Sequence, residues 1–74
     1  MTPISLKEAT VGTEYRIQSI ALDDEELRSF LFSLGCYDGE PITVIKSRRS
    51  GCIVSIKDGR YSIDSALASA ITVA

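Results

Sequence analysis

The sequence predicts a mainly β protein: a small barrel of about five short strands, with one inserted α-helix and short helical turns. Three observations lead to this prediction. Several short runs alternate apolar and polar residues, which is the period of a half-buried strand. One segment, residues 23–34, instead repeats its leucines at helical spacing. Glycines stand between these runs, where the chain must turn. Closing so few strands into a barrel would remove the exposed edges that invite aggregation.

The length of the chain limits it to one domain, residues 1–74. A chain this short buries roughly 60% of its unfolded surface, so its core is thin. The apolar content of 45% is sufficient for a globular fold. No apolar run approaches the ~20 residues of a membrane span, and no secretory signal is recognised. We therefore expect a cytoplasmic protein that does not insert into the membrane.

The first predicted elements are a helical turn and a strand. Ser5 and Glu8 have the spacing of a capping box, which predicts a short helical turn that stops near Gly12. Residues 14–20 then alternate as a strand. The alternation fails at Ile20, which predicts a bulge or a strand end there.

The helix is predicted at residues 23–34. Its first four residues are carboxylates, and negative charge is favoured near a helix N-terminus. A calcium loop would need alternating oxygen ligands and a distant bidentate Glu, and the segment has neither. Leu27, Leu31 and Leu34 form one apolar stripe. Phe32 lies off that stripe, so it is either a contact residue or packed under a neighbouring loop.

A pair of glycines predicts how the chain leaves this helix. Gly35 follows the last stripe residue, where helices often close in a left-handed conformation that glycine adopts without steric cost. Gly39 supplies a second permissive position before the next strand. Leu31, Leu34, Gly35 and Gly39 are therefore expected to be structural residues that anchor the helix and turn the chain into the barrel.

The second half of the chain is predicted to be mostly strand. Residues 40–47 and 52–57 alternate as strands around a polar loop at 48–51. A helical turn capped by Asp64 or Ser65 follows, and the chain ends in a brief strand at 71–73.

A two-residue signal, Asp58-Gly59, predicts the last hairpin. Gly59 is therefore expected to be a structural turn residue. The turn would place Lys57 opposite Arg60, and the apolar residues of both strands would share one face of the sheet.

The residue types exclude much chemistry. Histidine is absent, so the chain lacks an imidazole base and cannot build a Ser-His-Asp or Cys-His site alone. No nucleophile–base pair or phosphate loop is found, so we expect no catalytic residue, no cofactor and no enzymatic activity. Cys36 and Cys52 are weak metal candidates, because they lie 16 positions apart without a CxxC spacing. The expected state of both cysteines is a free thiol that packs as a small apolar residue, and a disulfide is the other alternative to a metal site.

Taken in order, these features resemble the FeoA family, a small cytoplasmic protein of the bacterial ferrous iron transport system. The resemblance covers nearly the whole chain. It is carried by the opening Leu6-x-x-Ala9-x-x-Gly12, the central Leu31-x-x-Leu34-Gly35-x-x-x-Gly39 and the closing Gly59-x-Tyr61-x-Ile63. It implies an SH3-like β-barrel with a helix inserted between the first strands. Asp38 stands where the family usually has proline, and aspartate also suits a turn.

The resemblance implies a non-enzymatic accessory module that docks on the cytoplasmic side of a ferrous iron transporter, on the subunit with a GTP-binding domain. It would modulate transport by binding one state of that subunit more tightly than another. Residues 41–60 hold five basic side chains and one acidic one, which predicts a basic docking face at one end of the barrel. The candidate contact residues are Phe32, Tyr37, Arg48 and Arg49.

Two other functions are left open. A small barrel with basic strands and an adjacent Tyr61 is compatible with nucleic-acid binding, against which stand a net charge of −2 and a pI of about 4.9. Direct binding of a transition-metal ion would have to use Cys36 and Cys52 without any histidine. A weak homo-oligomer is also left open.

Overall fold

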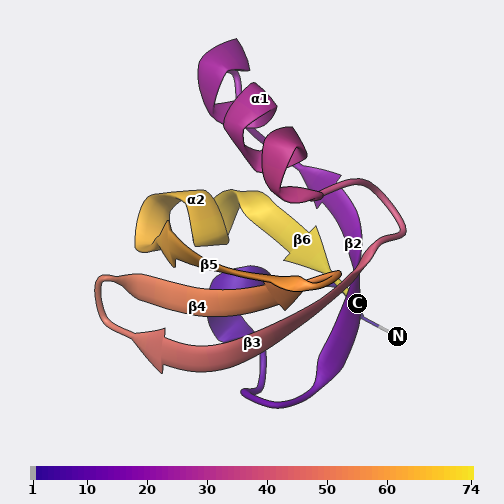
Figure 1. Cartoon of the computed structure of the whole chain (residues 1–74), viewed down its shortest axis with the longest axis vertical. Helices are drawn as coiled ribbons and strands as arrows, with labels where there is room; N and C mark the ends of the chain where they lie inside the picture. Colours follow the sequence, from indigo (N-terminus) through magenta and orange to yellow (C-terminus); the bar gives the residue numbers. More distant parts are fainter. Residues whose placement is uncertain (1) are drawn as a thin grey trace.

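The computed structural model of the protein describes residues 2–74. Within them the chain forms six strands, two α-helices and one 3-10 helix (Figure 1). In chain order the elements are β1 (Ile4–Ser5), η1 (Leu6–Glu8), β2 (Glu14–Ile20), α1 (Glu25–Leu34), β3 (Pro41–Arg48), β4 (Gly51–Ile56), β5 (Gly59–Asp64), α2 (Ser65–Ala70) and β6 (Ile71–Val73). The mainly β prediction is confirmed. The short strand β1 was not predicted, and it brings the strand number from five to six.

The strands form one antiparallel sheet in the order β1-β6-β2-β3-β4-β5, which curls around the core (Figure 1). β2 holds the sheet together because its first half pairs with β3 and its second half with β6. The register shifts between Ile17 and Ser19, which is earlier than the irregularity predicted at Ile20. Ile20 itself is buried and pairs with Ile71.

The gap between the two edges of the sheet is filled by the short helix α2. This helix contacts β4 and β5 on one side and η1 and β1 on the other. Asp64 caps it by accepting a hydrogen bond from the backbone N–H of Leu67 at 2.8 Å. Within residues 2–74, β1 and β5 remain edge strands, because no strand pairs with their outer sides. The prediction that barrel closure removes the exposed strand edges is therefore wrong.

Helix α1 stands above the sheet and is only partly buried (Figure 1). Leu31 is fully buried and Leu34 packs against the core, but Leu27 is 39% exposed. The predicted leucine stripe is therefore wrong at its first member, because the first turn of α1 extends beyond the sheet. Phe32 is half-buried against the core, and Phe30 is exposed. Within residues 2–74 no helix has the length and apolarity to cross a membrane.

The two ends of α1 have distinct caps. Asp24 precedes the helix, and its carboxylate accepts hydrogen bonds from the backbone N–H groups of Glu26 and Leu27 at 2.9 and 3.3 Å. Gly35 ends the helix in the left-handed conformation, with φ +100°. The backbone N–H of Cys36 then donates to the Leu31 carbonyl at 3.1 Å, which brings the chain back under the helix.

The turn between β4 and β5 differs from the prediction. The turn residues are Lys57 and Asp58, one position earlier than expected, and Lys57 has φ +54°. Gly59 lies opposite Ile56 in the ladder, so Lys57 does not pair with Arg60. The register is therefore wrong by one residue in each strand.

Gly59 is needed in this hairpin to make room for the Tyr61 side chain, not to form the turn. A Cβ atom on Gly59 would collide with the phenol oxygen of Tyr61, which lies across it. The ladder pairs Val54 with Tyr61 and Cys52 with Ile63. The observed register differs from the predicted one by one residue in each strand, two in total. An even shift keeps each residue on the same face, so the predicted apolar residues still face the core.

The remaining predicted elements are close to the observed ones. Strands predicted at 40–47 and 52–57 are each displaced by one residue. The N-terminal helical turn is limited to η1, and it has no side-chain cap, because the Ser5 hydroxyl donates to the Glu8 carboxylate at 3.1 Å instead.

Candidate protein-interaction site

Two aromatic rings and two cations form a cluster near the C-terminal end of α1. The rings of Phe32 and Tyr37 stack with centroids 5.6 Å apart and planes 11° from parallel. The Arg28 guanidinium carbon lies 5.6 Å from the Phe32 ring centroid, and the Lys57 ammonium nitrogen lies 5.7 Å from that of Tyr37. We call these four residues the aromatic platform. Each ring has a cation over it, an arrangement that the ring quadrupoles favour.

The glycine turn after α1 positions the two rings. Phe32 lies in the last turn of the helix, and Gly35 reverses the chain behind it. Cys36 points into the core with 0% exposure, so the next side chain, Tyr37, comes to lie against Phe32. Tyr37 remains 47% exposed. The fold thus presents a stacked, pre-ordered aromatic surface to solvent.

The two cations come from different parts of the fold. The Arg28 guanidinium is tied to the end of β2, because it donates to the Ile20 carbonyl at 3.2 Å. Lys57 is carried by the β4–β5 turn. Arg28 could have been found from the sequence, since it precedes Phe32 by one helical turn. Lys57 could not, because it reaches Tyr37 only through the tertiary fold.

An open hollow of about 500 Å³ lies beside the aromatic platform. It is bordered by α1 and the glycine turn on one side and by the β4–β5 hairpin on the other. Besides platform residues, its lining includes Leu34, Gly35, Ile56, Gly59 and Tyr61.

The other predicted contact residues lie elsewhere. Arg48 ends β3, and Arg49 occupies the turn before β4, both exposed. This turn and the Lys57 turn lie at opposite ends of β4, because successive turns of an antiparallel meander alternate between ends. The prediction that the two hairpins form one basic end is therefore wrong. The structure brings Phe32 and Tyr37 together and leaves the two arginines apart from them.

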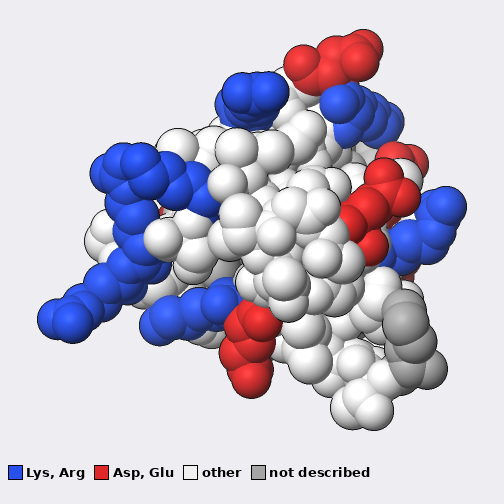
Figure 2. All heavy atoms as spheres, turned by 90° about the horizontal axis from the view of Figure 1, so that it is seen from below, with Lys and Arg blue, Asp and Glu red and all other residues white. Residues whose placement is uncertain are grey.

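The basic residues instead share a face of the sheet. The register places Lys46 beside Ile53, Arg48 beside Gly51, and Arg60 beside Ser55, all on the outer side of β3, β4 and β5. We call Lys46, Arg48 and Arg60 the basic face. In Figure 2 several Lys and Arg side chains gather on the left, the side that carries the β3–β4 turn in Figure 1, and others lie at the top and on the right.

The two cysteines are free thiols inside the core. Cys36 is 0% and Cys52 is 6% exposed. Burial raises the pKa of Cys36 to about 11 and also raises the pKa of Cys52. A protonated thiol is a poor metal ligand, since the thiolate is the binding form. Among residues 2–74, no group of three or more His, Cys, Asp or Glu side chains could hold a metal ion.

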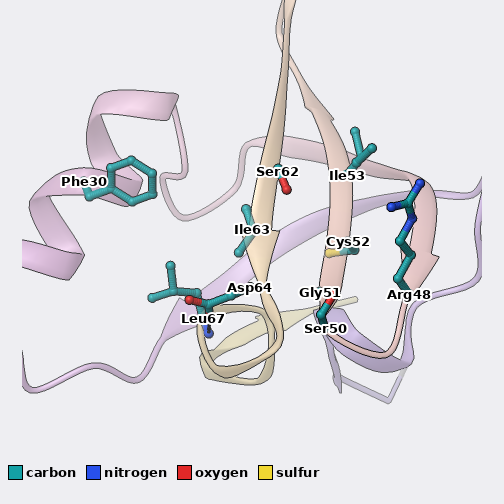
Figure 3. A pocket seen from close by; sticks show the side chains of 10 residues that line it. All are labelled: Phe30, Arg48, Ser50, Gly51, Cys52, Ile53, Ser62, Ile63, Asp64 and Leu67. Atoms are coloured by element: carbon teal, nitrogen blue, oxygen red, sulfur yellow. Dashed lines mark hydrogen bonds between the residues drawn. The ribbon is translucent and has the colours of Figure 1, made fainter.

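One exposed aromatic residue, Phe30, was not among the predicted contact residues. Phe30 is 45% exposed and lies over a second pocket, next to β5 (Figure 3). A signal for it was available, because Phe30 is one residue before the buried Leu31 and so is turned about 100° away from the core-facing side of the helix.

A small curled antiparallel sheet, with one helix between its second and third strands and another before its last, defines a small β-barrel domain. The chain belongs to the FeoA domain family, which its sequence matches over residues 4–74. The predicted resemblance is confirmed. The prediction that the chain is not an enzyme is confirmed with it, because FeoA proteins are non-enzymatic accessory proteins.

Solved structures support the same fold. An iron uptake regulatory protein, FeoA, shares 27% identity and a TM-score of 0.87, with 99% of this chain and 96% of that chain covered. The zinc complex of FeoA from Stenotrophomonas maltophilia, described as a prokaryotic SH3 domain protein, shares 18% identity and a TM-score of 0.83, covering 96% and 89%. A manganese-dependent transcriptional repressor shares 20% identity and a TM-score of 0.88, and 96% of this chain matches 40% of the repressor.

These likenesses establish the SH3-like fold that the sequence predicted. The repressor shows that the same fold also occurs as part of a longer chain. No curated protein matches the sequence.

Proposed function

We propose that this protein is an accessory module of bacterial ferrous iron uptake, and that it docks on the cytoplasmic GTP-binding subunit of the transporter. Family membership over residues 4–74 supports the link to iron uptake. The name of one matched protein refers to iron uptake regulation, and another is described as a candidate activating factor of ferrous iron transport. In this proposal residues 1–74 act in the cytoplasm as a single domain.

The observation that carries the docking proposal is the exposed aromatic platform. Tyrosine and arginine are enriched among the residues that contribute most to protein–protein binding. Stacking and the neighbouring cations already restrict Phe32 and Tyr37, so little side-chain entropy is lost when a partner covers them. The adjacent hollow of about 500 Å³ offers room for an apolar side chain of the partner.

Regulation in this proposal comes from differential affinity. A small module shifts the transporter between its states only if it binds one state more tightly than the other. The difference in binding free energy between the two transporter states then sets the largest shift that the module can cause in their equilibrium. No chemical step by this chain is required.

Arg48 and Arg49 would contribute in a different way from the platform. Both are exposed at the β3–β4 turn, away from Phe32 and Tyr37. Charges at the rim of an interface mainly change the rate of association and its salt dependence. We therefore assign long-range attraction to the arginines and the specific contact to the platform.

The proposal is tested by measuring binding of the purified chain to the purified cytoplasmic GTP-binding domain of the transporter. Tyr37→Ala should weaken binding at least about tenfold, since residues at the centre of an interface typically contribute 2 kcal/mol or more. Val11→Ala is the matched control, because Val11 is another exposed apolar residue and lies outside the platform. Wild-type binding that persists after Phe32→Ala, Tyr37→Ala, Arg48→Ala and Arg49→Ala are combined in a folded chain would refute this docking face.

A further inference from the structure

Lys57 has an unfavourable backbone conformation. Its φ is +54°, and among residues 2–74 it is the only non-glycine residue with a positive φ. A side chain in this left-handed region destabilises the backbone, because its Cβ atom comes too close to the following carbonyl oxygen. Glycine adopts the same conformation without that penalty. The turn is therefore less stable with lysine at this position than it would be with glycine.

The sequence of this hairpin contains a turn without such strain. Asp58-Gly59 would form a favourable two-residue turn, because both residue types tolerate left-handed conformations. The observed turn uses Lys57 and Asp58 instead, and Gly59 lies in the ladder without a positive φ. Strained backbone persists only where the surrounding structure imposes it, and such residues cluster at binding sites. The contacts of Lys57 should therefore show what the strain supports.

The side chain of Lys57 crosses the glycine turn to reach the aromatic platform. Its Cδ and Cε atoms lie 3.8 Å from the place that a Cβ atom of Gly35 would occupy, an ordinary van der Waals distance. Its ammonium nitrogen lies 5.7 Å from the ring centroid of Tyr37. The apolar part of the lysine thus covers Gly35, and its charge lies over the ring.

Tyr37 depends on such contacts for its position. It lies in the turn between Gly35 and Gly39, both of which have a positive φ, and it is 47% exposed. Two contacts hold its ring: the stack on Phe32 at 5.6 Å, and the ammonium of Lys57. Phe32 belongs to α1, whereas Lys57 belongs to the β4–β5 turn. Lys57 therefore links the exposed ring to the sheet.

We propose that Lys57 is a positioning residue of the aromatic platform, and that its strained backbone is retained because it places the ammonium that fixes the Tyr37 ring. The consequence for docking rests on the proposed function, but the positioning can be measured without a partner. Replacing Lys57 by glycine should relieve the strain and weaken docking, two changes of opposite sign. A residue with a purely structural role would change both in the same direction.

Thermal unfolding tests the strain. Lys57→Gly should melt about 4 °C or more above Lys57→Ala, because both variants lack the ammonium and only glycine relieves the positive φ. Asp58 provides the matched control, since it is the other turn residue and its φ is not positive. There Asp58→Gly should melt at or below Asp58→Ala. A melting temperature of Lys57→Gly equal to or below that of Lys57→Ala would overturn the proposal.

NMR of the free chain tests the positioning. In the wild type, the ring protons of Phe32 and Tyr37 should show nuclear Overhauser contacts. Lys57→Gly and Lys57→Ala should weaken these contacts, whereas Lys57→Arg should retain them, because a guanidinium also binds the face of a ring. Equal contacts in all three variants would overturn the proposal. The lysine would then serve the carboxylates of Glu14 and Glu40, which border a hollow that Lys57 also lines.

Docking on the purified GTP-binding domain of the transporter measures the consequence. Lys57→Gly and Lys57→Ala should each bind at least about threefold more weakly than the wild type, and Lys57→Arg should bind nearly as well as the wild type. Tyr37→Ala in the same experiment separates the two proposals. If Tyr37→Ala weakens binding and Lys57→Gly does not, the docking face stands and the positioning role is wrong. If Tyr37→Ala binds as the wild type does, the proposed docking function fails, and the melting and NMR measurements still decide whether Lys57 positions the ring.

Discussion

At the residue scale, close approach between backbones distinguishes Gly51 from the other glycines. A Cβ atom at Gly51 would collide with the Ile63 carbonyl oxygen and lie 2.8 Å from the Cα atom of Asp64. Gly12 provides a contrast, because it has φ +87° but open space around its Cα atom. Gly12 is thus required by its own backbone conformation, whereas Gly51 is required by the neighbouring strand.

This contrast predicts unequal costs for the same substitution. Gly12→Ala should lower the free energy of unfolding by about 1 kcal/mol, the cost of a left-handed backbone with a side chain. Gly51→Ala should lower it by about 2–3 kcal/mol, since a backbone segment must move to make room. Urea denaturation of both variants gives the comparison. Equal losses would contradict the role assigned to the close approach.

The buried thiol of Cys36 makes stability depend on alkaline pH. Burial raises its pKa from 9.0 to about 11 in the folded state. As pH rises above 9.0, the unfolded chain loses this proton first, so the unfolded state is favoured. The contribution to stability is therefore complete below pH 9.0 and disappears by about pH 11.

We expect the free energy of unfolding to decrease by about 2 kcal/mol across this interval because of Cys36. Urea denaturation as a function of pH, under reducing conditions, measures the decrease. Cys36→Ala has no thiol at this position and should show a correspondingly smaller slope. An unchanged slope in this variant would mean that other groups cause the alkaline destabilisation.

At the element scale, helix α1 depends on its caps more than on its burial. Leu31 is its one fully buried side chain, and the first turn extends beyond the sheet (Figure 1). The carboxylate of Asp24 satisfies two N–H groups of that turn. Because α1 carries both Phe30 and Phe32, the cap also supports the two hollows along β5.

Asp24→Ala should therefore destabilise the chain by about 1 kcal/mol, the usual value for loss of an N-cap carboxylate. Amide hydrogen exchange in the first turn of α1 should accelerate more than exchange in β4. Asp23→Ala is the matched control, because it removes a neighbouring carboxylate that makes no cap hydrogen bond. Similar acceleration in both variants would assign the effect to helix-dipole charge instead of the cap.

At the scale of the whole molecule, the curled sheet separates two surfaces. The aromatic platform lies at the end of α1 and the β4–β5 turn, whereas the basic face covers the outer side of β3, β4 and β5. The edge of β5 runs between them.

The sequence alone determined the elements and much of their ends. The carboxylates and leucines place α1, although the predicted start at residue 23 is two residues before the observed one at Glu25. Gly35 defines the end of α1, and the alternation at 14–20 defines β2 at its observed bounds. These features depend on local backbone and side-chain preferences, which adjacent residues carry in full. They were also sufficient for the family resemblance. The β4–β5 register was predicted wrongly because Gly59 is needed for contact with Tyr61, which a turn signal does not encode.

Only the tertiary structure decided which residues meet. The tertiary fold places Lys57 next to Tyr37 and Arg48 and Arg49 away from both, and within residues 2–74 it leaves the outer edge of β5 without a strand partner. These outcomes depend on the curl of the sheet and on which ends of the strands the turns occupy. Such long-range geometry arises from packing among residues far apart in the chain, so no local pattern in the sequence contains it.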